Sequence, residues 1–198
     1  MAVSVIAILM AIIIPAIGGA QNSAKRAKTR VQFSQWSAAI EQFRQEYGYY
    51  PVYADNRVNG GTIGALPAGE HIFHDVLAGR RRNGDPLPTG SGSTATAPER
   101  QNPKRISFCS FSGTEISASG RVQDAFGNAD IGVVVDRNLS SFISFGTVAD
   151  DYTVIPSGAV LAGTTGSTLN FPITTETRIR AGVAFYSAGD GQTPVTSW

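Results

Sequence analysis

Cysteine is almost absent from this chain. Cys109 is the single cysteine among 198 residues, so the protein cannot form an intramolecular disulfide. It lies between Phe108 and Phe111 in a stretch that is typical of a strand. We therefore interpret Cys109 as a small apolar side chain of the core and not as a reactive thiol.

An excess of charge of either sign is also missing. The 16 Lys and Arg residues nearly balance the 15 Asp and Glu residues, which gives a formal net charge of +1 at pH 7. Proteins that bind nucleic acids depend on a strong positive field, so no nucleic-acid partner is expected.

Histidine is equally scarce, and this limits the catalytic and metal-binding chemistry that can be proposed. His71 and His74 are the only two histidines, three residues apart and near Asp75 in a short helix predicted at 71–79. No further histidine and no suitable cysteine completes a zinc site, so we interpret both as polar surface residues. The glycine-rich TGSGST at 89–94 lacks the lysine of a phosphate loop, and no serine has a G-x-S-x-G context. No enzymatic activity and no firm cofactor are expected.

Charge is absent altogether from the first twenty residues, MAVSVIAILMAIIIPAIGGA. As a helix, this stretch would be roughly 30 Å long, which matches the hydrocarbon core of a bilayer. The small residues Gly18, Gly19 and Ala20 also suit a signal-peptide cleavage site, but no positive region precedes the apolar run. Residues 1–20 are therefore predicted to be a retained transmembrane or filament-core segment, with a cleaved signal peptide as the alternative.

Helical periodicity continues beyond Ala20. An apolar stripe recurs every three or four residues, at Phe33, Trp36, Ile40, Phe43 and Tyr47, and we extend it backwards through Ala24, Ala27 and Val31. No Gly or Pro interrupts 21–47, and Gly48 and Pro51 provide a stop. Residues 21–50 are predicted to be the amphipathic continuation of one long helix. Pro15 is either a tolerated kink or the start of a soft segment at 15–19.

The remaining residues, 51–198, are rich in Gly, Ser and Thr and are predicted to form one β-rich head with long loops. Residues 80–103 are low in apolar side chains and are predicted to be a mobile linker. Strands are predicted at 105–111, 131–136, 142–145, 152–155, 159–161, 168–173 and 181–187.

The N-terminal segment VSVIAILMAIIIPAIG, which runs into a basic and then an amphipathic helix that ends near YGYYP, resembles the N-terminus of type IV pilin-like proteins. Three later stretches are similar to motifs of the major pseudopilin of type II secretion: NPKRISF at 102–108, DAFGNADIGVVVDRN at 124–138 and FYSAGDG at 185–191. The resemblance implies an α+β, pilin-like fold, in which a long N-terminal helix packs on an antiparallel sheet.

The start of the chain departs from that family. Aligned on Pro15, the sequence lacks the basic leader and roughly seven further residues, including the family's early glutamate. We expect a piece of a longer gene product.

The resemblance also implies a calcium ion in a C-terminal loop, and Ser187 and Asp190 occupy the matching positions. Calcium binds six to eight oxygens, but no carboxylate follows Asp190. A calcium site at Ser187 and Asp190 is thus one interpretation, and a simple Asp-Gly turn at 190–191 is the favoured one.

Three functions are compatible with these features. The first is a structural subunit that polymerises through its N-terminal helix into a pilus or pseudopilus. The second is a minor or adhesive pilin with a ligand-binding head, and the third is a membrane-tethered or secreted binding domain. The resemblance implies an inner-membrane, single-pass protein with its head in the periplasm, and a periplasmic or extracellular filament after assembly. The implied partners are copies of the chain, the assembly platform, minor pseudopilins and lipid. The basic residues after Ala20 would by themselves favour the cytoplasmic side.

Overall fold

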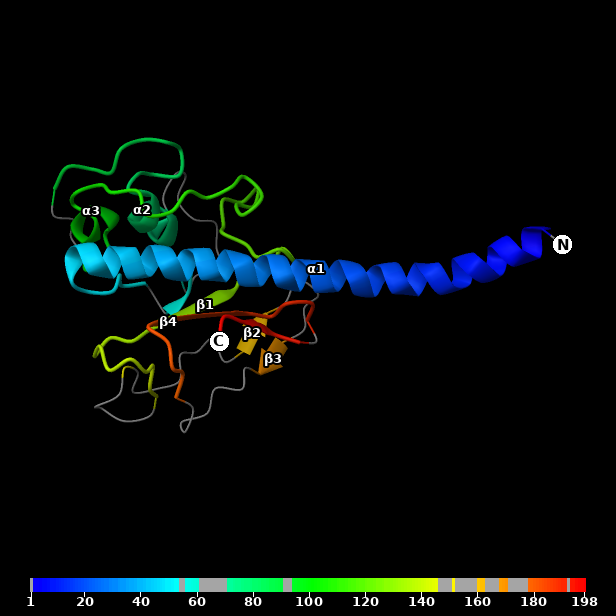
Figure 1. Cartoon of the computed structure of the whole chain (residues 1–198). Helices are drawn as coiled ribbons and strands as arrows, with labels where there is room; N and C mark the ends of the chain where they lie inside the picture. The colour runs from blue at the N-terminus through cyan, green and yellow to red at the C-terminus, as the bar shows by residue number, and fades with distance from the viewer. Residues whose placement is uncertain are drawn as a thin grey trace.

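A computed structural model describes residues 2–53, 56–60, 71–90, 94–145, 151, 160–162, 168–170, 178–191 and 193–198. For residues 2–17, 160–162 and 168–170 the description is limited to the backbone. The fold is α+β, with one long N-terminal helix packed on a three-stranded antiparallel sheet, as the sequence predicts (Figure 1).

The long helix, α1, spans Ala2–Tyr47 without a break, which confirms the prediction of a single helix. Its end is fixed by Gly48, which adopts a φ of 79° and donates its N–H to the Arg44 carbonyl over 2.8 Å. This left-handed conformation suits glycine and ends the helix. Figure 1 shows that the C-terminal half of α1 lies along the head, whereas the N-terminal part projects beyond it. Among the described residues, no helix meets the length and hydropathy required of a membrane span.

The docked face of α1 follows the predicted stripe only from residue 33 onwards. Phe33, Trp36, Ile40 and Phe43 are all buried. The backward extension is wrong, because Ala24 and Ala27 are exposed and Val31 is 58% exposed. Val31 lies two residues from Phe33, which turns it by roughly 200° to the opposite side of the helix.

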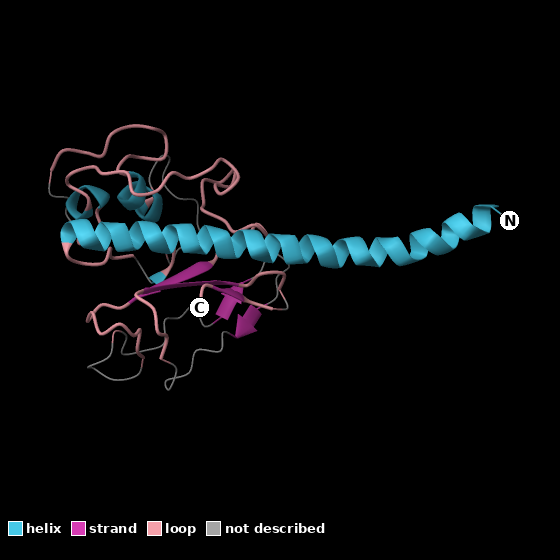
Figure 2. Cartoon of the chain, in the orientation of Figure 1, coloured by secondary structure: helices cyan, strands magenta, loops and turns pink. Residues whose placement is uncertain are grey.

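The main sheet has the order β1-β4-β5, with β1 at Ile131–Val135, β4 at Val183–Ser187 and β5 at Val195–Thr196. The β1–β4 pair is antiparallel and runs from Ile131 opposite Ser187 to Val135 opposite Val183. A second, two-stranded sheet pairs β2 (Val160–Ala162) with β3 (Thr168–Asn170) (Figure 2).

Both faces of the β1–β4 pair are covered, so every residue of these two strands is buried. On one face, Val133 and Phe185 join the core beneath α1. On the other face, Val134 and Tyr186 pack with Ile143 in a second cluster. This explains why the strands are continuously apolar instead of alternating with polar residues.

The sequence predicts β1, β4 and α2 well and other elements less well. Helix α2 spans Ile72–Ala78, within the predicted 71–79. Strands β2 and β3 overlap predicted strands, 142–145 is reduced to a bridge between Ile143 and Ile179, and β5 was not predicted. The strand predicted at 152–155 lies outside the described residues.

Two predicted segments have a different structure. Residues 105–111 form a loop and not a strand, because Arg105 has a φ of 55° and Phe108 and Cys109 both donate their N–H groups to the Leu77 carbonyl. The segment 80–103 contains a helix, α3, at Pro98–Gln101, and Asn102 after it is fully buried. This segment is therefore part of the packed head over its described residues.

Candidate functional site

The part of α1 that extends from the head is the first candidate for a functional element. Residues 18–25 are exposed, and Arg26 is the first residue of the helix with a half-buried side chain. We call residues 2–25 the projecting segment. Since a single uninterrupted helix joins this segment to the head, any movement of the docked half is passed to it directly.

Three polar residues begin the docked face, at a spacing of three residues. The Arg26 guanidinium lies 2.6 Å from Asp190, the Thr29 hydroxyl accepts the Ala125 N–H, and the Gln32 amide donates to the Gln123 carbonyl over 2.9 Å. Residues three apart lie on the same side of a helix, so these side chains attach α1 to two loops of the head.

Two of the motifs identified in the sequence meet beneath this end of α1. The Asp124 carboxylate accepts hydrogen bonds from the N–H groups of Phe126 and Asn128 and from the Ser187 hydroxyl, each over 2.8 Å. The Asn128 amide donates to the Gly189 carbonyl over 2.7 Å. The DAFGN turn thus holds the loop that follows β4. Burial raises the pKa of Asp124, and the hydrogen bonds from Ser187 and Asn128 oppose the rise.

Ser187 and Asp190, the candidate calcium ligands, lie in this loop but face different partners. Ser187 is the last residue of β4, is fully buried and donates to Asp124. One carboxylate oxygen of Asp190 contacts Arg26, and the other accepts the Thr193 N–H over 2.9 Å. Within the described part of the chain, no group of three or more His, Cys, Asp or Glu residues is placed to hold a metal ion.

Sequence reasoning missed the partners of these two residues. Arg26 was treated as one of four solvated basic residues after the apolar run. Its position two helical turns before Phe33 could have placed it on the docked face. Asp124 and Asn128 were noted only as part of a motif, and no local pattern indicates that they contact β4.

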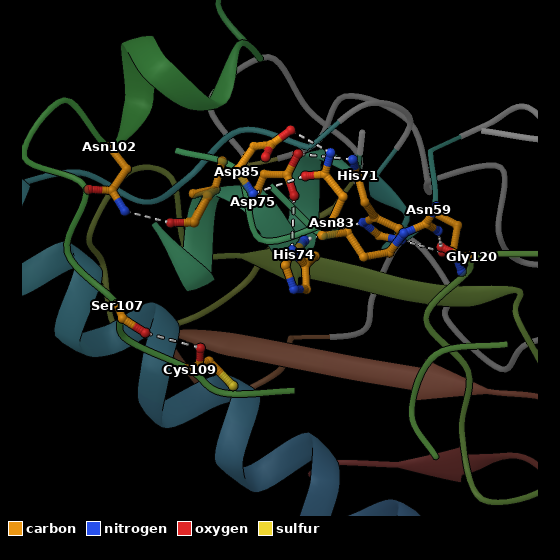
Figure 3. A network of polar contacts seen from close by, with 12 residues as sticks. Asn59, His71, His74, Asp75, Asn83, Asp85, Asn102, Ser107, Cys109 and Gly120 are labelled. Atoms are coloured by element: carbon orange, nitrogen blue, oxygen red, sulfur yellow. Dashed lines mark hydrogen bonds and ion pairs between the residues drawn. The ribbon is translucent and has the colours of Figure 1, made fainter. Parts of the chain in front are cut away.

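The third motif, NPKRISF, forms the other end of the head. The Asn102 amide donates to the carbonyls of Val76 and Ile106, over 2.8 and 2.7 Å. Its oxygen accepts the Tyr47 hydroxyl over 2.6 Å and the Ile106 N–H over 2.9 Å. Asn102 therefore ties the end of α1 to α2 and to the following loop (Figure 3).

His71 and His74 are buried, so their interpretation as surface residues is wrong. His71 is the N-cap of α2, and its Nδ1 accepts the His74 N–H over 3.2 Å. Its Nε2 lies 2.7 Å from the Asn59 side-chain oxygen, which fixes the proton on Nε2. His74 Nδ1 lies 2.9 Å from Asp75, whose other oxygen accepts the His71 N–H (Figure 3).

These contacts give the histidine cluster a structural use. A cavity of about 230 Å³ borders His71 and Asp75, with Arg81 and Glu99 on its wall. However, both nitrogens of His71 and both oxygens of Asp75 are already engaged by protein groups. Burial, followed by the nearby charges of His74 and Arg82, lowers the pKa of His71 to about 3. His71 is therefore a neutral cap.

We expect acid to destabilise the head through His71. In the unfolded chain this side chain titrates near its ordinary pKa of 6.5, and in the folded chain near 3. Below pH 6.5 the unfolded state binds the additional proton, so stability is lost as the pH falls from 6.5 towards 3. The loss between pH 7 and pH 5 should be about 2 kcal/mol.

The measurement is the urea midpoint of the full chain at pH 7 and pH 5, for wild type and His71→Asn. Asparagine also caps helices but does not titrate. The wild-type midpoint should fall more steeply with pH than that of the variant. Equal slopes would show that His71 is not the titrating group.

Cys109 agrees with its interpretation as an apolar side chain. It is half-buried and packs against the core beneath α1. Burial and the charge of Glu115 raise its pKa to about 11, so the thiol stays protonated at neutral pH.

An apolar groove of about 240 Å³ lies at the end of the head where α1 stops. Tyr49, Val52 and Leu139 line it and are each about half exposed, at 42%, 42% and 53%. Leu139 has a φ of 58°, an unusual conformation for a branched residue. The Asp136 carboxylate stabilises it by accepting the next two N–H groups along the chain, those of Ser140 and Ser141. We call this surface the tip groove.

Comparison of the chain with family models, with curated proteins and with solved structures finds no match.

Proposed function

We propose that this protein is a structural subunit that polymerises through its N-terminal helix into a filament of the type IV pilus or type II secretion kind. The observation that carries the proposal is the continuity of α1. One helix extends from Ala2 to Tyr47, with its second half docked on the head and its first part projecting (Figure 1). An assembly helix needs this arrangement, because the head must be fixed to the segment that packs with other copies.

Before assembly, the projecting segment is held in the inner membrane, with the head in the periplasm. Its apolar residues exchange lipid for neighbouring copies at little cost, because lipid tails and apolar helices offer similar contacts. The heads then form an outer shell through contacts between different surfaces of successive copies. Such contacts do not close, and they produce a fibre instead of a ring. The assembly platform and minor subunits are the further partners.

Residues 15–19 are the part of the helix suited to a change of environment. The backbone of α1 stays helical through Pro15, Gly18 and Gly19. Proline removes one helical hydrogen bond and glycine lowers helix stability, so this segment extends more easily than its neighbours.

The tip groove favours a second candidate function, a minor or adhesive subunit at the end of a filament. Exposed apolar side chains around a cavity are typical of binding surfaces. The abundance of the protein in purified filaments separates the two functions, since a minor subunit would be rare.

The test is Ile13→Asp in the natural gene product, with Ile13→Leu as the matched control. A carboxylate at this position costs about 2.5–3.5 kcal/mol in an apolar segment, and a packed bundle repeats that cost in every copy. Electron microscopy should show filaments for wild type and Ile13→Leu and none for Ile13→Asp. Wild-type protein that stays monomeric would refute the filament. A mature protein that begins at Gln21 would support a cleaved signal peptide and a secreted domain instead.

A further inference from the structure

The loop after β4 is attached to the head and to α1 at three points. The Asn128 amide holds the Gly189 carbonyl, the Arg26 guanidinium lies 2.6 Å from Asp190, and the Thr193 N–H returns to Asp190. Gly189 has a φ of 61°, and a side chain there would overlap the Thr193 carbonyl. The loop is thus a tight, built structure.

The oxygens that calcium would need in this loop already face hydrogen-bond donors. Both Asp190 oxygens accept protein groups, one of them a guanidinium that carries a full positive charge. The Ser187 hydroxyl donates its proton to Asp124, whose oxygens also accept two backbone N–H groups. A divalent ion bound at Asp190 would lie next to the Arg26 charge and would have few oxygens to complete its shell. The residues present do not fit a calcium ion.

We propose that Arg26 is the resident cation of this loop: its guanidinium closes the loop on α1, and the loop needs no divalent metal. The Arg26 and Asp190 side chains are only 27% and 17% exposed, so the pair is partly protected from solvent. Such a pair is less screened by salt than the exposed pair of Lys104 with Glu46, whose side chains are 60% and 36% exposed.

The position of this pair has a second consequence. Arg26 is the first residue of α1 with a half-buried side chain, so its contact with Asp190 is the attachment nearest to the projecting segment. The C-terminal loop therefore helps to fix the direction in which that segment leaves the head. This consequence for assembly rests on the proposed function, whereas the closure of the loop by Arg26 does not.

The test is hydrogen exchange of the full, unassembled chain in detergent, with 5′ to 3′ gene context unchanged and with either calcium or a chelator in the buffer. In wild type, the amides of 188–197 should exchange at the same rate in both buffers. Arg26→Gln and Asp190→Asn should each speed exchange there by about tenfold or more, while β1 (Ile131–Val135) keeps its protection. Lys28→Gln is the matched control, because Lys28 is an exposed basic residue of the same helix, and it should change nothing.

Two results would overturn the proposal. One is a wild-type loop that calcium protects by tenfold relative to the chelator. The other is unchanged exchange of 188–197 in both Arg26→Gln and Asp190→Asn. Since exchange is measured on the unassembled chain, failure to form filaments would refute the proposed function and leave this inference standing.

Discussion

Trp36→Ala is expected to lower the free energy of unfolding by about 3–5 kcal/mol, the usual range for removing a large aromatic side chain from a core. Trp36 is 1% exposed and lies where α1, α2 and β4 meet. Its ring is 5.3 Å from that of Phe73 and 5.5 Å from that of Phe185, in edge-on arrangements that favour aromatic pairs. Removal leaves a cavity bordered by all three elements, and none of them can move to fill it alone.

Pulse proteolysis of the full chain across a urea series measures this loss without relying on tryptophan fluorescence. Val31→Ala is the control, since Val31 is an apolar residue of the same helix on its exposed side. It should change stability by less than about 0.5 kcal/mol. Equal losses in the two variants would mean that α1 is not docked through the face that contains Trp36.

The difference between Trp36 and Val31 shows how far periodicity alone predicts the fold. Spacing of three and four residues from Phe33 to Phe43 predicts the docked face, because apolar side chains decide the packing there. Before Phe33 the docked face turns polar, with Thr29 and Gln32 both buried and hydrogen-bonded to loops. A search for apolar residues cannot find such a face. It instead connected small residues that lie on the other side of the helix.

The candidate site was predictable only in part for a related reason. The sequence identifies Ser187 and Asp190 as a pair within one loop, but their partners Asp124 and Arg26 are distant in the chain. Their meeting depends on the tertiary fold and has no local signal. His71 is a similar case: it occupies the N-cap position, where Ser or Asp is usual, and its burial follows from Asn59, which approaches from another loop.

Asn102→Asp should have the second large effect, a loss of about 2–4 kcal/mol, although the two side chains have almost the same shape. The Asn102 amide group donates to the Val76 and Ile106 carbonyls, and a carboxylate has no proton to offer either of them. The variant would place a charged oxygen against two carbonyl oxygens at a fully buried position. Each buried group that loses its partner costs about 1–3 kcal/mol.

Asn22→Asp introduces the same chemical change on the exposed side of α1 and serves as the control. Urea midpoints of the two variants at pH 7 should therefore differ strongly, with Asn22→Asp close to wild type. Because Asn102 also accepts the Tyr47 hydroxyl, its loss should loosen the last turn of α1 first. Hydrogen exchange near Tyr47 should then rise more than exchange near Thr29, at the other end of the docked face. An Asn102→Asp variant as stable as wild type would show that this asparagine does not hold α1, α2 and the following loop together.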